Sequence, residues 1–328
     1  MSATNLTKIK RVPSVSTVAP QQAENPVVWW VLTIEPERHD LCDEVVRRIV
    51  APLRGQAQKW GGHRSAFTRS LKPKKPQVHL SLYAPADVVD RVLRFAQVLA
   101  DECAPSVGTV NLFPSEGVVF PTRGEPAPAA VETFSSLYGG LQGMRLQAEM
   151  AELGSEVAIW AINRFPKDNM RSALAALMLF DNCDTMMRGP KAALWPDRRI
   201  VTWDYYWDTH LRQCTAAFGP RAVEARRTLP ARLAPKIGPA HRVMTAIAAE
   251  PSVDVWRKRW VRAIDTYLYR ADKTRVSRSA QQLITMESRK LLNRFGISMR
   301  DEAALGLYAR AWNPDREGPA SASRIRHH

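Results

Sequence analysis

The densest group of side chains that could move protons or stack on flat rings lies in segment 203–212. If this segment is helical, Tyr206 and His210 lie one turn apart, and Trp207 shares the side of His210. Tyrosine and histidine exchange protons, and tryptophan stacks on planar rings. The candidate catalytic residues are therefore Tyr205, Tyr206 and His210, with Trp207 and Arg212 as candidate substrate-binding residues. The alternative is an amphipathic helix that packs these rings into the core around a hydrogen-bonded histidine.

A second candidate site is the alternating segment 78–83, in which Val78, Leu80 and Leu82 are apolar. A period of two predicts a half-buried strand. The other face carries three neutral side chains that could bind a substrate, namely His79, Ser81 and Tyr83. The alternative is that this face is simply the solvent side of the strand.

Segment 279–295 predicts a helix that carries three further candidates for substrate binding. Ser279 and Gln282 stand at its start, where a serine that caps the helix and a surface amide are the alternatives. Arg289 could hold a carboxylate or carbonyl of a peptide, or form a surface ion pair. Both interpretations of Arg289 stay open.

The chain carries a large positive charge. Its 328 residues include 47 Lys or Arg and 32 Asp or Glu, which gives a net charge of +15. Such a field concentrates nucleic acid, an anionic membrane or an acidic peptide, although solvated basic faces are the plain alternative. The basic residues occur in scattered pairs, and no RRM, KH, zinc-finger or helix-turn-helix pattern accompanies them, which argues against nucleic acid.

No segment indicates export, a membrane span, a metal or a cofactor. The N-terminus lacks an apolar signal region, and the apolar run 27–34 is far shorter than the roughly 20 residues that cross a bilayer. The four cysteines are scattered, without a CxxC pair or a Cys/His cluster of metal-ligand spacing. Neither GxGxxG, a P-loop, GxSxG nor HExxH occurs. We therefore expect a cytoplasmic protein with reduced thiols.

Periodicity divides the chain into a strand-containing part and a helical part. We expect a disordered arm over 1–26, one domain over 27–312 and a flexible tail over 313–328. The predicted strands are 27–34, 78–83, 107–113 and 117–120. The predicted helices are 40–54, 87–102, 141–164, 170–185, 203–218, 240–250, 253–269 and 279–295. The fold class is α+β, with a small sheet and packed helices first and a mostly helical C-terminal part.

Three segments, taken in order, resemble the lantibiotic dehydratase C-terminal family of thiopeptide biosynthesis. Segment 138–156 contains Tyr-Gly-Gly, then Gln-Ala-Glu and Gly-Ser-Glu, and is similar to the family's tyrosine–glycine signature. Segment 289–297, Arg-Lys-Leu-Leu-Asn-Arg-Phe-Gly-Ile, resembles the family's HMHxNR helix, and Glu302 stands at the acidic position that follows. Segment 78–83 resembles the family's strand pHLRLRF. Tyr138, Glu149, Asn293 and Arg294 belong to these motifs, and we expect structural roles for them.

The chain departs from this pattern where the family's dehydratases eliminate glutamate. The resemblance associates that step with two strand arginines and the first motif histidine, and here these are Ser81, Tyr83 and Arg289. The strand therefore lacks a cationic fork for a carboxylate, and the helix lacks a group that titrates near neutrality. The resemblance thus implies a relative that keeps the scaffold and has lost the elimination chemistry.

The branch that this description resembles is the thiopeptide macrocyclases, or pyridine synthases. The resemblance implies a cofactor-independent enzyme of the bacterial cytoplasm that joins two dehydroalanines of one precursor peptide by a formal [4+2] cycloaddition, with loss of water and leader peptide. It implies an acidic leader, bound at a sheet edge near 27–34 or as a helix in a groove, and other enzymes of the pathway as partners. The alternatives are the glutamate-eliminating half of a split tRNA-dependent dehydratase and a non-catalytic peptide- or tRNA-binding module.

Overall fold

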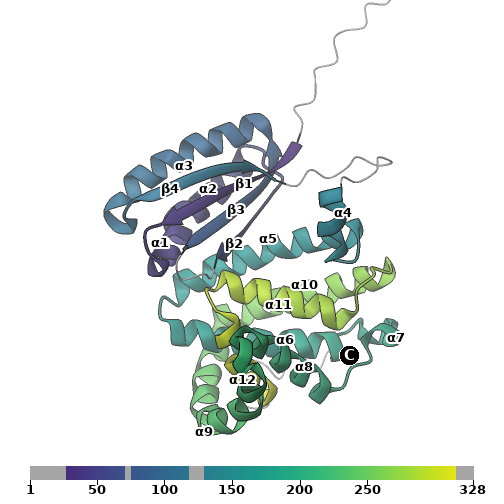
Figure 1. Ribbon diagram of the computed structural model, residues 1–328. Helices are drawn as coiled ribbons and strands as arrows, with labels where there is room; N and C mark the ends of the chain where they lie inside the picture. Colours follow the sequence, from purple (N-terminus) through teal and green to yellow (C-terminus); the bar gives the residue numbers. More distant parts are fainter. Residues whose placement is uncertain (1–26, 71–74, 118–128, 315–328) are drawn as a thin grey trace, which may run out of the picture.

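The computed structural model describes residues 27–70, 75–117 and 129–314 (Figure 1). Four antiparallel strands form one sheet in the order β2-β3-β1-β4. The strands are β1 (Val27–Pro36), β2 (Arg64–Ser70), β3 (Gln77–Pro85) and β4 (Val110–Glu116). β1 is an interior strand, because it pairs with both β3 and β4. Segment 27–34 is therefore not itself a sheet edge, and the edge strand beside it is β4.

Helices cover one face of this sheet and leave the other face open (Figure 1). They are η1 (His39–Leu41), α1 (Cys42–Val45), the π-helical η2 (Val46–Val50), α2 (Ala51–Lys59) and α3 (Ala86–Val107). Leu32, Leu80 and Leu82 point to this side and are buried. The alternation in β3 places His79, Ser81 and Tyr83 half-buried on the open face, as the period of two predicts.

The rest of the described chain is helical. Its elements are α4 (Ala129–Ser136), α5 (Leu141–Arg164), α6 (Asp168–Arg188), η3 (Ala192–Leu194), α7 (Pro196–Arg199), α8 (Trp203–Thr215), η4 (Ala216–Arg221), α9 (Ala222–Ala248), α10 (Pro251–Lys273), α11 (Ala280–Arg294) and α12 (Met299–Arg310). α6 is the central helix, and every residue from 173 to 183 is buried. Asn182 ties it to two neighbours, because it donates to Ser288 of α11 at 2.8 Å and accepts from Trp260 of α10 at 2.7 Å.

The outer edge of β2 is closed by side chains of helices instead of by another strand. Asn293 of α11 accepts from the Arg69 N–H at 2.9 Å and donates to the Arg69 carbonyl at 2.8 Å. Arg294 donates from Nε to the Phe67 carbonyl at 2.8 Å, and the Phe67 N–H donates to Ser155 Oγ of α5 at 3.0 Å. An exposed strand edge is open to further pairing, so these contacts hold the sheet on the helical part and confirm structural roles for Asn293 and Arg294.

The expected elements and the structure agree best where the periodicity is long. The α+β class is confirmed, and segment 141–164 is a helix with the expected bounds. β2 and α12 were not expected, α9 begins at Ala222 although it contains three prolines, and segment 107–113 is a strand only from Val110. The arm 1–26 lies outside the described residues, as do residues 118–120 of the expected strand 117–120 and residues 315–328 of the tail.

Candidate active site

A cavity of about 310 Å³ lies between the open face of the sheet and helices α5 and α11, and we call it the cleft. Figure 1 shows α5 passing below the sheet, with α11 on its far side. All three segments that resemble the dehydratase family contribute to its walls. The polar residues that line it are Thr68, Ser81, Tyr138, Gln147, Lys290 and Arg294, and apolar ones include Trp29, Val31 and Met144.

Tyr138 enters the cleft from a tight turn between α4 and α5. The turn needs glycine, because Gly139 and Gly140 have φ of 77° and 106°, and a Cβ on Gly139 would lie 2.6 Å from Val276. Tyr138 is 7% exposed. Burial, with a smaller contribution from the carboxylate of Glu287, raises the pKa of Tyr138 to about 12. Its phenol is therefore protonated at neutral pH and can act as a neutral hydrogen-bond donor.

Lys290 and Glu287 form a buried pair next to Tyr138. Lys290 Nζ lies 3.6 Å from Glu287 Oε1 and 4.1 Å from the centre of the Tyr138 ring. The Nζ atom is buried and makes no hydrogen bond to the described chain. Burial lowers the pKa of Lys290 to about 8 although Glu287 acts in the opposite direction. The cleft therefore has a positive charge that can be lost not far above neutral pH.

Arg294 places a second positive charge at the cleft. It is 1% exposed, and burial lowers its pKa to about 10. Its Nε holds the Phe67 carbonyl of β2, and it forms no ion pair with a carboxylate of the described residues. Arg294 thus has two roles: it closes the edge of β2 and it places positive charge at the cleft.

The three candidates on β3 occupy different parts of the open sheet face. Ser81 lines the cleft. His79 Nδ1 is 3.0 Å from Thr33 Oγ1 of β1, and burial lowers its pKa. Tyr83 lies towards one end of the face, with its ring 5.2 Å from that of Trp29 and 5.8 Å from that of His63.

Tyr205, Ser279 and Gln282 meet at a second cavity, of about 820 Å³, between the start of α8 and the start of α11. Ser279 accepts from the Gln282 N–H at 3.2 Å, and Gln282 Oε1 accepts from the Ser279 N–H at 3.0 Å. The two side chains thus form a capping box. The capping role considered for Ser279 is confirmed, and Gln282 shares in it.

The other candidates of α8 lie in the core. Tyr206, Trp207 and His210 are 1%, 2% and 2% exposed, and burial raises the pKa of Tyr206. They pack as the alternative of an amphipathic core helix describes. Arg212 is exposed on the same helix. Arg289 of α11 turns towards α8, because its Nη2 donates to Gln213 Oε1 at 2.8 Å.

One group of metal-type ligands escaped the sequence analysis, because Glu302 is remote from the other two members in sequence. His210, Cys214 and Glu302 place ligand atoms within 4.8 Å of one another, all buried. His210 Nε2 is 3.0 Å from Glu302 Oε1, which is a hydrogen-bond distance, and Arg289 Nε lies 3.9 Å from the same oxygen. The cation already beside this carboxylate competes with a metal ion. Burial raises the pKa of Cys214, which keeps its thiol protonated.

Tyr138, Lys290, Thr68 and Gln147 were not among the residues predicted to bind or react. Tyr138, Lys290 and Gln147 stand inside the motif segments, so the resemblance pointed to their neighbourhood. Thr68 belongs to β2, which no pattern predicted. No helix of the described residues is long and apolar enough to span a bilayer.

Comparison with known proteins identifies the fold. No protein-family model and no curated protein matches the sequence. Among solved structures, a pyridine synthase from thiomuracin biosynthesis, TbtD, overlaps with a TM-score of 0.55 at 14% identity, over 87% of this chain and 98% of that one. The crystal structure of TsrL overlaps with a TM-score of 0.61 at 15% identity, over 90% and 97%. The tRNA-dependent lantibiotic dehydratase MibB from Microbispora sp. 107891 overlaps at 17% identity and a TM-score of 0.49, over 95% of this chain and 29% of its own.

The chain therefore has the fold shared by TbtD and TsrL. The resemblance inferred from the three motif segments is confirmed at the level of fold.

Proposed function

We propose that the chain is a peptide macrocyclase of the pyridine synthase type. It joins two dehydroalanines of a modified precursor peptide by a formal [4+2] cycloaddition, and water and the leader peptide then leave. The observation that carries the proposal is the cleft, whose polar lining includes the neutral donors Ser81, Thr68 and Tyr138 where the sequence motifs converge. The fold shared with the pyridine synthase TbtD supports the same function.

The proposed reaction depends mainly on positioning. Two distant alkenes of a flexible peptide must meet, and holding them together supplies several kcal/mol of the barrier, of the order of 7–11 kcal/mol in well-oriented cases. The amide beside one dehydroalanine must take its imidic-acid form. The protonated phenol of Tyr138 and the hydroxyl of Ser81 can donate to that amide oxygen and favour this form. The positive charges of Lys290 and Arg294 can stabilise negative charge that develops on a substrate oxygen in the cleft.

Loss of water and leader requires protonation of the departing hydroxyl and amide. No oxidant is needed, because the two eliminations themselves bring the six-membered ring to the aromatic level. A reaction that proceeds through hydrogen-bond donors and positioning asks for little acid–base power, which suits a cleft of hydroxyl groups.

The test is incubation with a leader-bearing peptide that contains two dehydroalanines, followed by mass spectrometry. The expected products are free leader amide and a macrocycle that is lighter by the leader and one water. The matched control is Tyr138→Phe, which keeps the ring and removes the phenol. An unchanged peptide mass with bound peptide would contradict the proposal and favour a non-catalytic peptide-binding module.

Elimination of glutamate is the second candidate, and one observation favours it. Although the strand arginines are replaced, Lys290 and Arg294 place cations beside the cleft that could hold a glutamyl carboxylate. A peptide with glutamylated serine separates the two candidates. Release of glutamate would establish elimination, whereas the macrocyclase leaves this peptide unchanged.

A further inference from the structure

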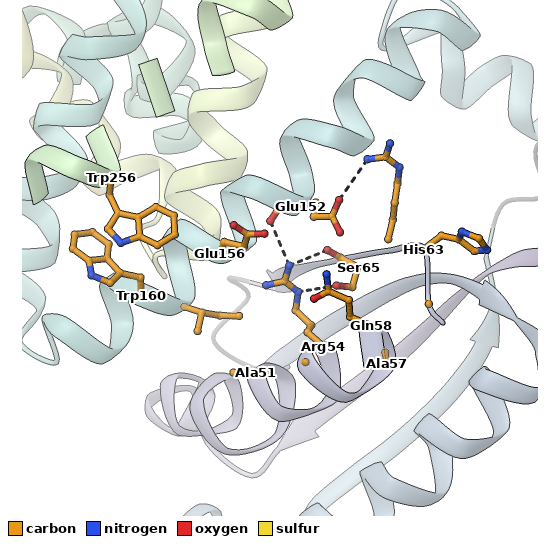
Figure 2. Close-up of a pocket in the computed structure, with 14 residues that line it drawn as sticks. Ala51, Arg54, Ala57, Gln58, His63, Ser65, Glu152, Glu156, Trp160 and Trp256 are labelled. Atoms are coloured by element: carbon orange, nitrogen blue, oxygen red, sulfur yellow. Dashed lines mark hydrogen bonds and ion pairs between the residues drawn. The ribbon is translucent and has the colours of Figure 1, made fainter. Parts of the chain in front are cut away.

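A third cavity, with a polar lining, lies beside β2, between α2 and α5, and we call it the Arg54 pocket (Figure 2). Its volume is about 450 Å³. One wall is apolar and contains Ile159, Trp160 and Trp256, with the two indoles 5.5 Å apart. The other walls carry Arg54 of α2 and two glutamates of α5.

Arg54 is held rigidly at this pocket. It is 9% exposed. Its Nε donates to Ser65 Oγ at 3.0 Å, and its Nη2 donates to the carbonyls of Ser65 and Glu152 at 3.2 and 3.4 Å. Figure 2 shows the third nitrogen, Nη1, directed away from these partners and towards the side of Trp160 and Trp256. Two nitrogens therefore fix the guanidinium, and the third faces the pocket.

Among the described residues, no carboxylate lies within ion-pair distance of Arg54, in contrast to most other buried arginines. The other buried arginines that line neither cavity each pair with an aspartate: Arg69 with Asp43 at 2.6 Å, Arg171 with Asp43 at 2.8 Å, Arg199 with Asp272 at 2.9 Å and Arg257 with Asp181 at 2.7 Å. Arg54 forms no ion pair within the described residues. Buried charges are normally paired, because desolvation is costly. This cost lowers the pKa of Arg54.

The two glutamates of the pocket act on Arg54 electrostatically, but each forms its ion pair with another arginine. Glu152 pairs with Arg64 at 3.4 Å, and Glu156 pairs with Arg259 at 2.6 Å. With these two pairs balanced, the charge left over at the pocket is that of Arg54. A ligand that supplies one carboxylate beside an apolar group would match both the charge and the indole wall.

We infer that the Arg54 pocket binds an acidic peptide, with a side-chain carboxylate on Arg54 Nη1 and a neighbouring apolar side chain against Trp160 and Trp256. The inference rests on the proposed function only in taking the peptide to be the leader of the substrate. The net charge of +15 attracts such a peptide. Glu152 lines the pocket and Ala151 lines the cleft, so the two cavities adjoin the same turn of α5.

The test measures binding of a fluorescein-labelled peptide in which glutamate alternates with leucine, and of its glutamine counterpart, by fluorescence anisotropy. The chain should bind the glutamate peptide about tenfold more tightly, which is about 1.4 kcal/mol. Arg54→Met should remove this preference. Because that variant also removes the donor of the Ser65 hydroxyl and carbonyl, its folding is checked by circular dichroism.

A second variant blocks the pocket without touching those hydrogen bonds. A Cβ on Gly55 would meet nothing within 4 Å, so Gly55→Phe can place its ring in the pocket from helix α2. Gly55→Phe should lower the affinity for the glutamate peptide about tenfold, whereas Gly55→Ala should bind this peptide with the affinity of the parent. Arg91→Met removes one charge from α3, outside the pocket, and should also keep the preference.

Equal affinity of the parent for both peptides would overturn the inference, and so would a preference that survives in Arg54→Met and Gly55→Phe. The two proposals fail separately. Glutamate-selective binding without cyclisation would contradict the macrocyclase proposal and support the proposal for the Arg54 pocket. Cyclisation that is insensitive to Gly55→Phe, together with equal binding of both peptides, would contradict the proposal for the Arg54 pocket and support the macrocyclase proposal.

Discussion

The cleft and the Arg54 pocket both adjoin β2, and each contains a buried arginine without a carboxylate partner in the described chain. In the cleft, Arg294 stands among hydroxyl groups and a titratable lysine. In the pocket, Arg54 stands among glutamates that are already paired, beside an indole wall. Both arginines also hold backbone carbonyls of β2. Both sites thus contain an arginine that binds a β2 carbonyl. In the cleft it lies beside neutral hydrogen-bond donors suited to a reaction, and in the pocket its unpaired charge is suited to binding an anion.

The largest expected difference concerns stability. Arg294→Met leaves the Phe67 carbonyl without its donor in a tightly packed place and should lower the free energy of unfolding by about 3 kcal/mol. Arg54→Met should cost less, about 1 kcal/mol, because water in the pocket can reach the freed Ser65 carbonyl. Urea denaturation of both variants measures this. Equal losses would show that the two arginines close the strand edge in the same way.

The next largest effect concerns catalysis. Tyr138→Phe should lower the rate of cyclisation about a hundredfold, because one positioned donor to a developing oxyanion is worth about that much. Gly55→Phe should leave the rate at saturating peptide unchanged and raise KM only. Steady-state kinetics of the two variants tests whether the cleft carries the reaction and the pocket only binds peptide. A fall in kcat for Gly55→Phe would contradict this separation.

Salt should act on the pocket more than on the cleft. At about 1 M salt the Debye length falls to roughly 3 Å, so the steering of an acidic peptide by the basic surface is lost. Binding of the glutamate peptide should weaken about tenfold, whereas single-turnover cyclisation of bound peptide should change little. Anisotropy and rapid-quench measurements across a salt series test this. Salt-independent binding would contradict a charge-based role.

The last expected effect is a pH dependence that belongs to the cleft. The pKa of Lys290 is about 8 in the folded chain, below its ordinary 10.5, so the unfolded chain binds more protons between these values. Stability contributed by this lysine must therefore rise with pH across that window. The free energy of unfolding of the parent relative to Lys290→Met should rise by about 1 kcal/mol per pH unit between pH 8 and 10. Glu287, Arg294, Tyr138 and Tyr267 face the same cluster and remain in both proteins. A constant difference would contradict the shifted pKa.

The sequence predicted elements with a clear period and missed elements that depend on distant side chains. Segment 141–164 was predicted with its observed bounds because its apolar residues recur over six turns. β2 was missed because its backbone is satisfied by Ser155, Asn293 and Arg294, which lie far away in sequence. No local pattern records such pairing.

The candidate site shows the same limit. The period of α8 correctly places Tyr206 and His210 on one side, but it does not tell that this side faces the core. The alternation of β3 predicted the open face, and Ser81 does line the cleft. Arg54 stands at the end of the expected helix 40–54, yet its burial depends on Ser65 and Glu152 of other elements. Periodicity therefore predicts which residues share one face of a helix or strand, whereas tertiary contacts determine whether that face lies in the core or lines a cavity.

Photo-cross-linking tests most directly whether the reaction takes place in the cleft. A leader-bearing peptide with benzoylphenylalanine in place of one dehydroalanine is bound and irradiated, and the modified residues are mapped by mass spectrometry. We expect cross-links to Met144, Tyr138 and the β2 residues that line the cleft. Cross-links confined to the cavity around Ile200, Tyr205 and Gln281 would contradict this expectation and return the site to the region between α8 and α11.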